Sequence, residues 1–300
     1  MKIGFNSVAC PAWDLNSIVT NAREMGFGGV ELRAIAGECD LPSAPELARD
    51  ADAVRSLFAK NGIDLVCLGS AVTLDSTDAK IVAAQKERLT DYVELAGRLG
   101  CPFVRLYIGE VQRWDNQRRA LERMAAAVSS CAQVAARAGV TLLVENGSDL
   151  GTSQDMWFVI DAVNHPAVRT CWNQCNALIN LERATNSLPR MGGRIGMVHV
   201  CDAIFGELGV LLDYVPLGEG GAEVARQVEL LKGMAYDGYL MFEWPRMWFD
   251  SLADPMVALP KAVSFLRSCV DAKQTVLSAY KNDKYAPRLP SLGAQAANPS

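Results

Sequence analysis

Short β-rich runs alternate with longer helical stretches along most of the chain, and this alternation constrains the fold more than any other feature. We expect eight strands, at Lys2–Asn6, Gly29–Leu32, Asp64–Gly69, Phe103–Tyr107, Thr141–Glu145, Val168–Asn173, Ile195–His199 and Tyr239–Glu243. The helices between them are expected at Leu15–Met25, Ala44–Asn61, Ala79–Leu99, Trp114–Ala138, Thr152–Val163, Leu181–Arg190, Ala222–Ala235 and Pro255–Val270. Repeated βα units of this kind predict an α/β fold with a parallel sheet.

The ends of the helices and the composition of the strands support this interpretation. Gly26, Gly62, Gly100 and Gly139 stand where helices should stop in a left-handed cap, each shortly before the next strand. Leu142–Val144 is apolar at successive positions, which is typical of parallel strands that are buried on both faces.

An open, doubly wound sheet is the alternative architecture, because it uses the same βα units. Such a sheet normally carries a glycine-rich phosphate turn after an early strand, and the sequence contains no such turn. The chain has 300 residues, and a closed (β/α)8 TIM barrel typically needs about 250. We therefore predict a single barrel domain over 1–272. A polar tail over 273–300 is expected to be mobile or to pack on a neighbouring subunit of a homo-oligomer.

The composition excludes several classes of protein. Half of the residues are hydrophobic and 21% are charged, as in globular proteins, and the net charge of −5 argues against a nucleic-acid surface. The first residues lack the pattern of a secretory signal, and no apolar run is long enough to predict a membrane span. The nine cysteines are scattered rather than spaced as a disulfide framework, which predicts reduced thiols and a cytoplasmic protein.

Polar residues end each of the last four predicted strands. Glu145 ends TLLVE, Asn173 ends VRTCWN, His199 ends IGMVH and Glu243 ends YLMFE. Residues at the carboxyl ends of barrel strands project into one pocket, and carboxylates with an imidazole suit a divalent metal ion. Without a cation, Glu145 and Glu243 would be two negative charges buried close together with little solvation. The second histidine, His165, lies in a predicted turn and is interpreted as a structural residue of that turn.

The segments LLVENG, TCWNQCNA, MVHVCDA and LMFEWP, together with DYVPLGEGG and YDGYLMFEW, resemble the xylose-isomerase-like sugar phosphate isomerase/epimerase family, whose barrel is also called the AP endonuclease 2 type. The resemblance extends from Lys2 to about Val270. It implies one divalent metal ion, Mn, Mg, Co or Zn, bound by Glu, Asp, His and Glu at these four strand ends. Glu145, His199 and Glu243 match this set, whereas Asn173 stands where Asp is usual.

The resemblance also implies a mechanism in which Glu145 and Glu243 act as general base and acid around an enediolate. Two further positions depart from the family pattern, since Asn176 replaces a usual His and Phe205 replaces a usual Arg. These departures, with Asn173, count against a simple ketohexose epimerase. An Asn carbonyl oxygen can still bind a hard cation, although the site then carries less negative charge.

Several other residues are candidates for substrate binding, namely Arg105, Asn176, Asp202, Trp244 and Arg246. Two of them have a structural alternative: Arg105 can form an internal ion pair with Glu31, and Asp202 can cap a loop instead of orienting His199.

The three cysteines near His199 suggest a thiolate-bound zinc ion. Cys171 and Cys175 are spaced as C-x3-C, which is poor for a zinc knuckle, and Cys171 falls within a strand. With Cys201, they are therefore interpreted as structural.

The resulting prediction is a metal-dependent isomerase or epimerase that acts on a sugar or keto-sugar. One alternative is a lyase that uses the same ion, such as an inosose-type dehydratase or a C-glycoside-cleaving subunit. Another is a non-catalytic sugar-binding homologue whose metal site has decayed. An endonuclease of this fold needs a histidine-rich multi-metal site, which two histidines cannot supply.

Overall fold

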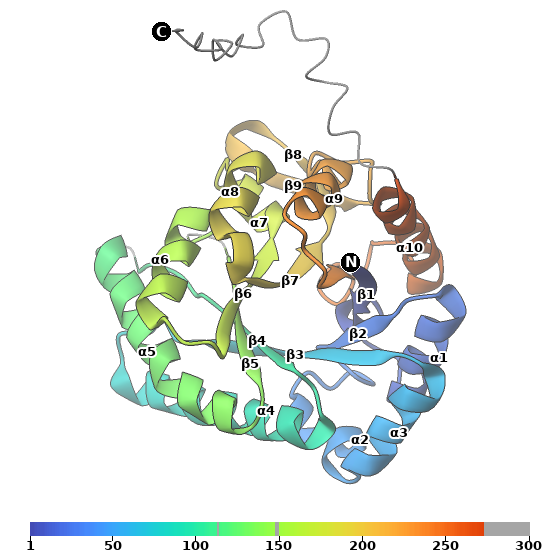
Figure 1. Cartoon of the computed structure of the whole chain (residues 1–300), viewed down its shortest axis with the longest axis horizontal. Helices are drawn as coiled ribbons and strands as arrows, with labels where there is room; N and C mark the ends of the chain where they lie inside the picture. Colours follow the sequence, from blue (N-terminus) through green and yellow to red (C-terminus); the bar gives the residue numbers. More distant parts are fainter. Residues whose placement is uncertain (113, 148–149, 273–300) are drawn as a thin grey trace, which may run out of the picture.

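Eight parallel strands form a closed barrel surrounded by helices, as Figure 1 shows. The computed structural model describes residues 1–112, 114–147 and 150–272, so the predicted tail lies outside the described residues. The strands of the barrel are β1 (Lys2–Asn6), β2 (Gly29–Leu32), β3 (Asp64–Thr73), β4 (Phe103–Tyr107), β5 (Thr141–Glu145), β6 (Val168–Asn173), β7 (Ile195–Val200) and β10 (Tyr239–Phe242). Their order, β1-β10-β7-β6-β5-β4-β3-β2, confirms the predicted (β/α)8 barrel.

The helices follow the strands along the chain and cover the outside of the barrel. They are α1 (Leu15–Met25), α2 (Pro45–Ala48), α3 (Ala51–Asn61), α4 (Ala79–Leu99), α5 (Gln117–Arg137), α6 (Ser153–Val163), α7 (Gln174–Ile179), α8 (Ala184–Met191), α9 (Val224–Gly233) and α10 (Pro255–Asp271). The glycines at 26, 62 and 100 end α1, α3 and α4 in the left-handed conformation, as predicted. In the described residues, no helix is both apolar enough and long enough to cross a membrane.

Two of the predicted helices have different boundaries in the structure, because polar side chains cap new helix starts. The helix predicted at Ala44–Asn61 is divided into α2 and α3, since Asp50 accepts a hydrogen bond from the backbone N–H of Ala53 and starts α3. The helix predicted from Trp114 begins only at Gln117, where Asn116 is the N-cap.

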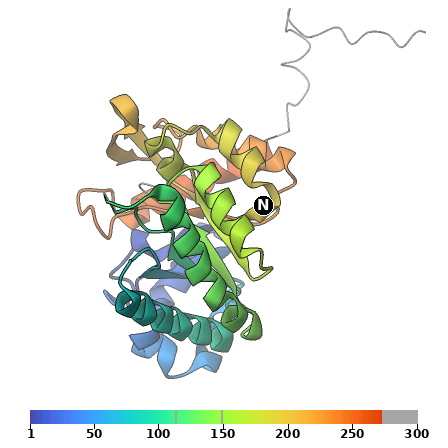
Figure 2. The ribbon, with the colours of Figure 1, turned by 90° about the vertical axis from the view of Figure 1, so that its left-hand side faces the viewer.

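The segment between β7 and α9 contains an antiparallel hairpin that the prediction lacked. Its strands are β8 (Asp202–Phe205) and β9 (Leu211–Val215), and it extends beyond the barrel at the upper left of Figure 2. The helix predicted at Leu181–Arg190 is α8, which begins three residues later and ends one residue later, whereas the short helix α7 was not predicted. The structure places α7 directly after β6 and α8 further along the chain.

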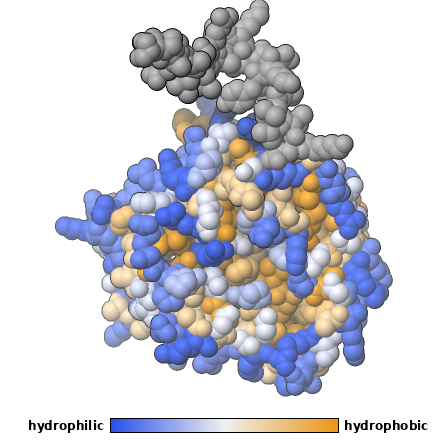
Figure 3. Space-filling view, viewed as in Figure 1, coloured by the Kyte–Doolittle hydropathy of each residue, from blue (hydrophilic) through white to orange (hydrophobic). Residues whose placement is uncertain are grey.

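Apolar side chains fill two layers, one inside the barrel and one between the strands and the helices. The inner layer is closed by Val66, Cys67, Leu143, Cys171, Met197, Tyr239 and Met241. The outer layer is much larger and includes the inward faces of all the long helices. In the view of Figure 3, hydrophilic residues dominate the periphery of the molecule and apolar residues gather nearer the middle. The polar residues at the carboxyl ends of the strands lie directly above this inner layer.

Candidate functional site

Three of the four predicted strand-end residues meet at the carboxyl end of the barrel with atoms that can bind a cation. Nδ1 of His199 lies 2.9 Å from Oε1 of Glu145 and 3.7 Å from Oε2 of Glu243. The side chains of His199 and Glu145 are buried, and that of Glu243 is 13% exposed. They come together because their strands, β5, β7 and β10, lie in one sector of the barrel.

Asn173 belongs to the same cluster, but its amide faces the carboxylates with the nitrogen. Nδ2 donates hydrogen bonds to Glu145 at 3.2 Å and to Glu243 at 3.0 Å. Oδ1 points the other way and accepts from the backbone N–H groups of Cys175 and Asn176 at the start of α7. Rotating the amide would turn its N–H groups toward those donors, so the cap fixes the orientation. In this arrangement Asn173 supplies a hydrogen-bond donor at the position where the family pattern has a metal ligand.

Replacing Asn173 by aspartate is expected to make the protein depend more strongly on a metal ion. A third carboxylate would face Glu145 and Glu243, so the metal-free variant should lose about 1–3 kcal/mol of stability. Added Mn²⁺ should raise its melting temperature more than it raises that of the wild type, because the new carboxylate can bind the ion. Thermal unfolding with and without Mn²⁺ measures this. Asn164→Asp, at an exposed helix end, controls for the added charge, and equal metal-induced shifts would contradict the prediction.

The ring of His199 contacts carboxylates on two sides. Nε2 lies 2.6 Å from Oε2 of Glu31, and Nδ1 faces Glu145. A neutral imidazole has one N–H, so only one of these two contacts can be a hydrogen bond. Burial opposes a charge on the ring, but the acidic groups around it raise the pKa of His199 well above its ordinary value, so the metal-free ring is protonated and both of its nitrogens can donate. A divalent ion would take the place of the proton on Nδ1. A divalent ion bound through three protein ligands fits this geometry, with Glu31 holding the ring in place.

Arg105 on β4 forms a buried ion-pair network below these residues. Its Nε donates to Oε1 of Glu31 at 3.1 Å, and its Nη1 lies 3.2 Å from Oε2 of Glu145. The guanidinium also lies over the ring of Tyr107, 4.3 Å from its centroid. The internal ion pair with Glu31, which was the structural alternative for Arg105, is therefore present.

The charged groups of this network give the carboxyl groups of Glu31, Glu145 and Glu243 different pKa values. Burial alone would raise the pKa of Glu31, but His199 and Arg105 lower it to about 2. Burial also opposes ionisation of Glu145, whose pKa His199 and Arg105 nevertheless hold below its ordinary value. For Glu243, burial and the nearby charge of Glu145 raise the pKa to about 7 despite His199. At neutral pH the site thus combines an ionised carboxylate with one that is partly protonated.

Glu31→Gln should lower the stability of the metal-free protein at neutral pH but not in strong acid. The lowered pKa of Glu31 stabilises the folded state fully above its unfolded-state pKa of about 4.3, and a shift of this size corresponds to about 3 kcal/mol. This contribution is lost as the pH falls toward the folded pKa of about 2. In urea denaturation from pH 6 to pH 3, the stability gap between wild type and variant should therefore narrow below about pH 4.5. A gap that stays constant would contradict this.

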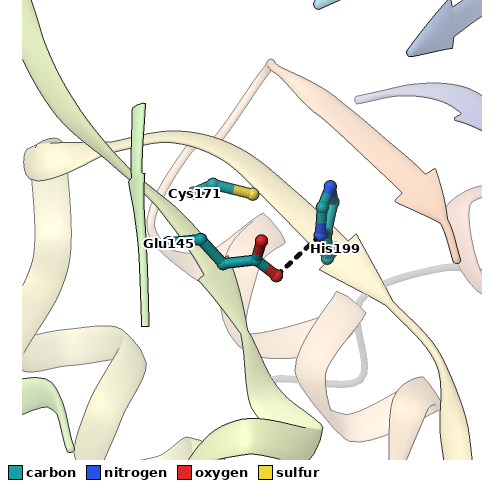
Figure 4. A group of neighbouring side chains, drawn as sticks. All are labelled: Glu145, Cys171 and His199. Atoms are coloured by element: carbon teal, nitrogen blue, oxygen red, sulfur yellow. Dashed lines mark hydrogen bonds and ion pairs between the residues drawn. The ribbon is translucent and has the colours of Figure 1, made fainter. Parts of the chain in front are cut away.

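Cys171 completes a group that can hold a metal ion, which the sequence prediction discounted. Ligand atoms of Glu145, Cys171 and His199 all lie within 4.8 Å of one another. Figure 4 shows these three side chains gathered at the ends of their strands. Burial raises the pKa of the Cys171 thiol to about 12, so it is neutral at physiological pH. Cys201 and Cys175 instead contact neighbouring oxygens, since Cys201 Sγ lies 3.7 Å from Oδ1 of Asn173 and Cys175 Sγ lies 3.4 Å from the Cys201 carbonyl.

The other predicted substrate-binding residues lie outside this cluster. Asp202 caps a loop, because its carboxylate accepts from four backbone N–H groups at residues 203, 218, 220 and 222. Trp244 stacks on Phe242 toward the helical layer and donates to the Ala253 carbonyl. Arg246 donates to the Leu252 carbonyl, and Asn176 donates to the carbonyl of residue 146.

Asn146 connects the ends of β5 and β6. Its Oδ1 accepts from the backbone N–H of Asn173 at 2.7 Å, and its Nδ2 donates to the carbonyls of Asn173 and Gly151. These bonds join the residue after Glu145 to Asn173, so the spacing of the two strand ends is fixed by a buried side chain.

Sequence reasoning missed two polar residues of the first strands that face the same carboxyl-end pocket as Glu145, His199 and Glu243. Asn6 ends β1 and Arg33 directly follows β2. Both are buried, and Asn6 is aligned with Glu31 across the sheet. The alternation of inward and outward residues was the signal that could have found them, because Glu31 and Arg33 are two positions apart on one chain segment.

The comparisons with known proteins agree with this architecture. The model of the xylose isomerase-like TIM barrel family matches residues 19–269. No curated protein sequence matches the chain. An L-ribulose 3-epimerase structure is 20% identical with a TM-score of 0.75, covering 95% of this chain and 99% of that one. The 3-keto-D-glucoside 4-epimerase YcjR from E. coli is 17% identical with a TM-score of 0.72, covering 90% and 100%.

A structure of the IOLI protein with a zinc atom is also similar, at 17% identity and a TM-score of 0.75, covering 90% of this chain and 98% of that one. At these identities the solved structures show a shared fold. The family model, by contrast, covers most of the sequence, including the strands that carry Glu145, His199 and Glu243. The chain therefore belongs to the xylose isomerase-like TIM barrel family.

Proposed function

We propose that this protein is a metal-assisted isomerase or epimerase of a sugar or keto-sugar, with Glu145 and Glu243 as the acid–base pair. The observation that carries the proposal is that these two carboxyl groups lie beside one imidazole nitrogen, 2.9 and 3.7 Å from it. Their pKa values are shifted in opposite directions. Such a pair suits removal of a proton by one group and its return by the other.

The metal ion would be held by Glu145, His199 and Glu243, and Mn, Mg, Co and Zn are all compatible with these ligands. When bound, it would supply a Lewis acid that polarises the substrate carbonyl. Glu31 keeps the Nδ1 atom of His199 directed at the site through its contact with Nε2. The zinc atom in the structure of the similar IOLI protein supports a divalent ion here.

The side chains of this chain divide the proton transfer between them. Glu145, ionised at neutral pH, takes the proton next to the carbonyl, and Glu243 holds or returns a proton at Oε2. Asn173 donates to both carboxylates and so keeps them at a fixed separation. Return of the proton to the opposite face inverts the carbon, and its return to the neighbouring carbon isomerises the substrate. The similar epimerase structures support this class of reaction.

The lyase alternative uses the same residues and differs in the loss of a β-hydroxyl. Solvent exchange separates these possibilities. Protein purified without chelator should contain about one divalent ion per chain, and in D₂O it should introduce deuterium at the carbon next to the carbonyl of a keto-sugar. Release of water as the main product would favour the lyase. Absence of metal at every concentration tested would favour a sugar-binding homologue with a decayed site.

The expected cellular setting also remains a proposal. All nine cysteines are free, which supports a reducing, cytoplasmic location. Assembly into a homo-oligomer stays a prediction that a measurement of molar mass in solution can test.

A further inference from the structure

The hydroxyl group of Tyr107, the last residue of β4, forms no hydrogen bond with any residue that the structure describes. The side chain is partly exposed, and its oxygen is not among the fully buried polar atoms without a partner, which leaves it accessible. The hydroxyls of Tyr92, Tyr236 and Tyr239, by contrast, each donate to an oxygen of the protein. Tyr214 shares the property of Tyr107, but it lies on the β8–β9 hairpin and not on a barrel strand. The Tyr107 hydroxyl is therefore available to a ligand.

The alternation of side chains along β4 directs Tyr107 into the carboxyl-end pocket. Arg105 is fully buried inside the barrel, whereas Leu106 packs in the outer layer. Residues two apart on a strand face the same side, so Tyr107 faces inward like Arg105, one step nearer the carboxyl end. Tyr107 is also aligned with Glu145 of the neighbouring strand β5. Its side chain therefore stands beside the carboxylate that we propose as the base.

The contact with Arg105 fixes the orientation of the Tyr107 ring. The guanidinium lies over the ring, 4.3 Å from the centroid, and a cation in this position is attracted to the ring face. Arg105 is itself held by Glu31 and Glu145 at 3.1 and 3.2 Å. The ring is thus oriented before any ligand binds, which lowers the entropy cost of binding.

The Tyr107 hydroxyl is a hydrogen-bond donor whose acceptor has to come from outside the protein. Burial raises the pKa of Tyr107 to about 12 against the opposing charge of Arg105, and Glu145 and Glu243 raise it further, so the hydroxyl keeps its proton at neutral pH. The carboxylate of Glu145 is already engaged, because Oε1 faces Nδ1 of His199 at 2.9 Å and Oε2 lies 3.2 Å from Nη1 of Arg105. The carbonyl and hydroxyl oxygens of a sugar in the pocket are suitable acceptors.

We infer that Tyr107 is a substrate-binding residue, whose hydroxyl donates a hydrogen bond to a hydroxyl oxygen of the keto-sugar on the Glu145 side of the pocket. This inference rests on the proposed function, because it uses the same pocket and the same base. The sugar hydroxyl does not react, so the bond has the same strength before and after proton removal and contributes to binding and not to the chemical step. The pocket should therefore select sugars that carry an oxygen at this position.

Tyr107→Phe tests the inference, because it keeps the ring under Arg105 and removes only the hydroxyl. In the Mn²⁺-loaded protein, KM for D-fructose or L-ribulose, whichever the wild type converts faster, should rise about three- to tenfold, the usual effect of losing one hydrogen bond. At the same time kcat should change by less than about twofold. The melting temperature should stay the same, since the hydroxyl has no partner among the described residues to lose.

Tyr236→Phe is the matched control, since it removes a hydroxyl that donates to the carbonyl of Tyr239 at 2.9 Å, at the start of β10. This change should lower the melting temperature and leave KM as it is in the wild type. The two variants thus separate a hydroxyl that serves the fold from one that serves the substrate.

An unchanged KM in Tyr107→Phe would overturn the inference, and so would a fall in kcat alone. A drop in melting temperature as large as that of Tyr236→Phe would overturn it too, because it would assign the Tyr107 hydroxyl to the fold. Calorimetric titration of the Mn²⁺-loaded proteins with the same two sugars distinguishes these results from failure of the proposed function. If the wild type binds a sugar without converting it, the acid–base proposal fails, whereas a Kd about three- to tenfold weaker in Tyr107→Phe still supports the inference. Binding of neither sugar would overturn the inference, and titration with Mn²⁺ alone reports on the metal site separately.

Discussion

Glu145→Gln and Glu243→Gln are each expected to reduce interconversion of the substrate by about 10²–10⁴-fold, the usual contribution of a general acid or base. Glutamine has the same shape as glutamate and can still accept from Asn173, so the fold and the position of the side chain should be kept. The measurement is kcat on the keto-sugar that the wild type converts fastest. Glu122→Gln, on an exposed part of α5, is the control.

Deuterium exchange between the solvent and the substrate tests whether Glu145 and Glu243 have opposite roles. If each carboxyl group serves one face of the substrate, one variant should still exchange deuterium into one of the two epimers while it fails to interconvert them. A variant that interconverts the epimers at the wild-type rate would remove that residue from the mechanism. Loss of exchange in both variants for both epimers would indicate that the pair acts only through the metal site.

Arg105→Met is expected to destabilise the metal-free protein by about 3–5 kcal/mol, the usual effect of breaking a buried ion pair. The side chain is fully buried and contacts Glu31 at 3.1 Å and Glu145 at 3.2 Å. Without the guanidinium these two carboxylates would remain buried with less compensation. Urea denaturation of the metal-free proteins measures the free energy of unfolding.

A double-mutant cycle separates the ion pair from the loss of packing. Arg105→Met combined with Glu31→Gln should be more stable than the sum of the single changes predicts, because the second change removes an uncompensated charge. Arg118→Met is a control, since its pair with Glu122 is exposed on both sides, and it should cost less than about 1 kcal/mol. Additive effects at positions 31 and 105 would show that the pair contributes no coupling.

The barrel strands were predictable because each is buried on both faces and bounded by clear turn signals. Seven of the eight begin and end within one residue of the expected positions, and β3 alone is longer, ending at Thr73. The β8–β9 hairpin was missed because its apolar side chains do not mark a buried face. Ile204, Leu208 and Leu212 are 45%, 83% and 62% exposed, so the usual link between apolar pattern and burial does not hold there.

The site was predicted from the rule that residues at the carboxyl ends of barrel strands face one pocket. This rule identifies the residues but does not give the orientation of their side chains. Asn173 was identified from its position, but the direction of its amide follows from α7, whose start the sequence pattern did not reveal. Trp244 was predicted to bind the substrate, although it follows Glu243 by one position and so faces the helices. Asn6 and Arg33 were not predicted, because the metal-ligand pattern of the family falls on the ends of the last four strands.

The link that Asn146 makes to Asn173 has a consequence for how such a barrel can change its specificity. The bonds of Asn146 to Asn173 bypass most of the loop between β5 and α6. A substitution elsewhere in that connection that keeps Asn146 should therefore leave the spacing of Glu145 and Asn173 unchanged. The geometry of the site and the sequence of the connection can therefore vary independently of each other.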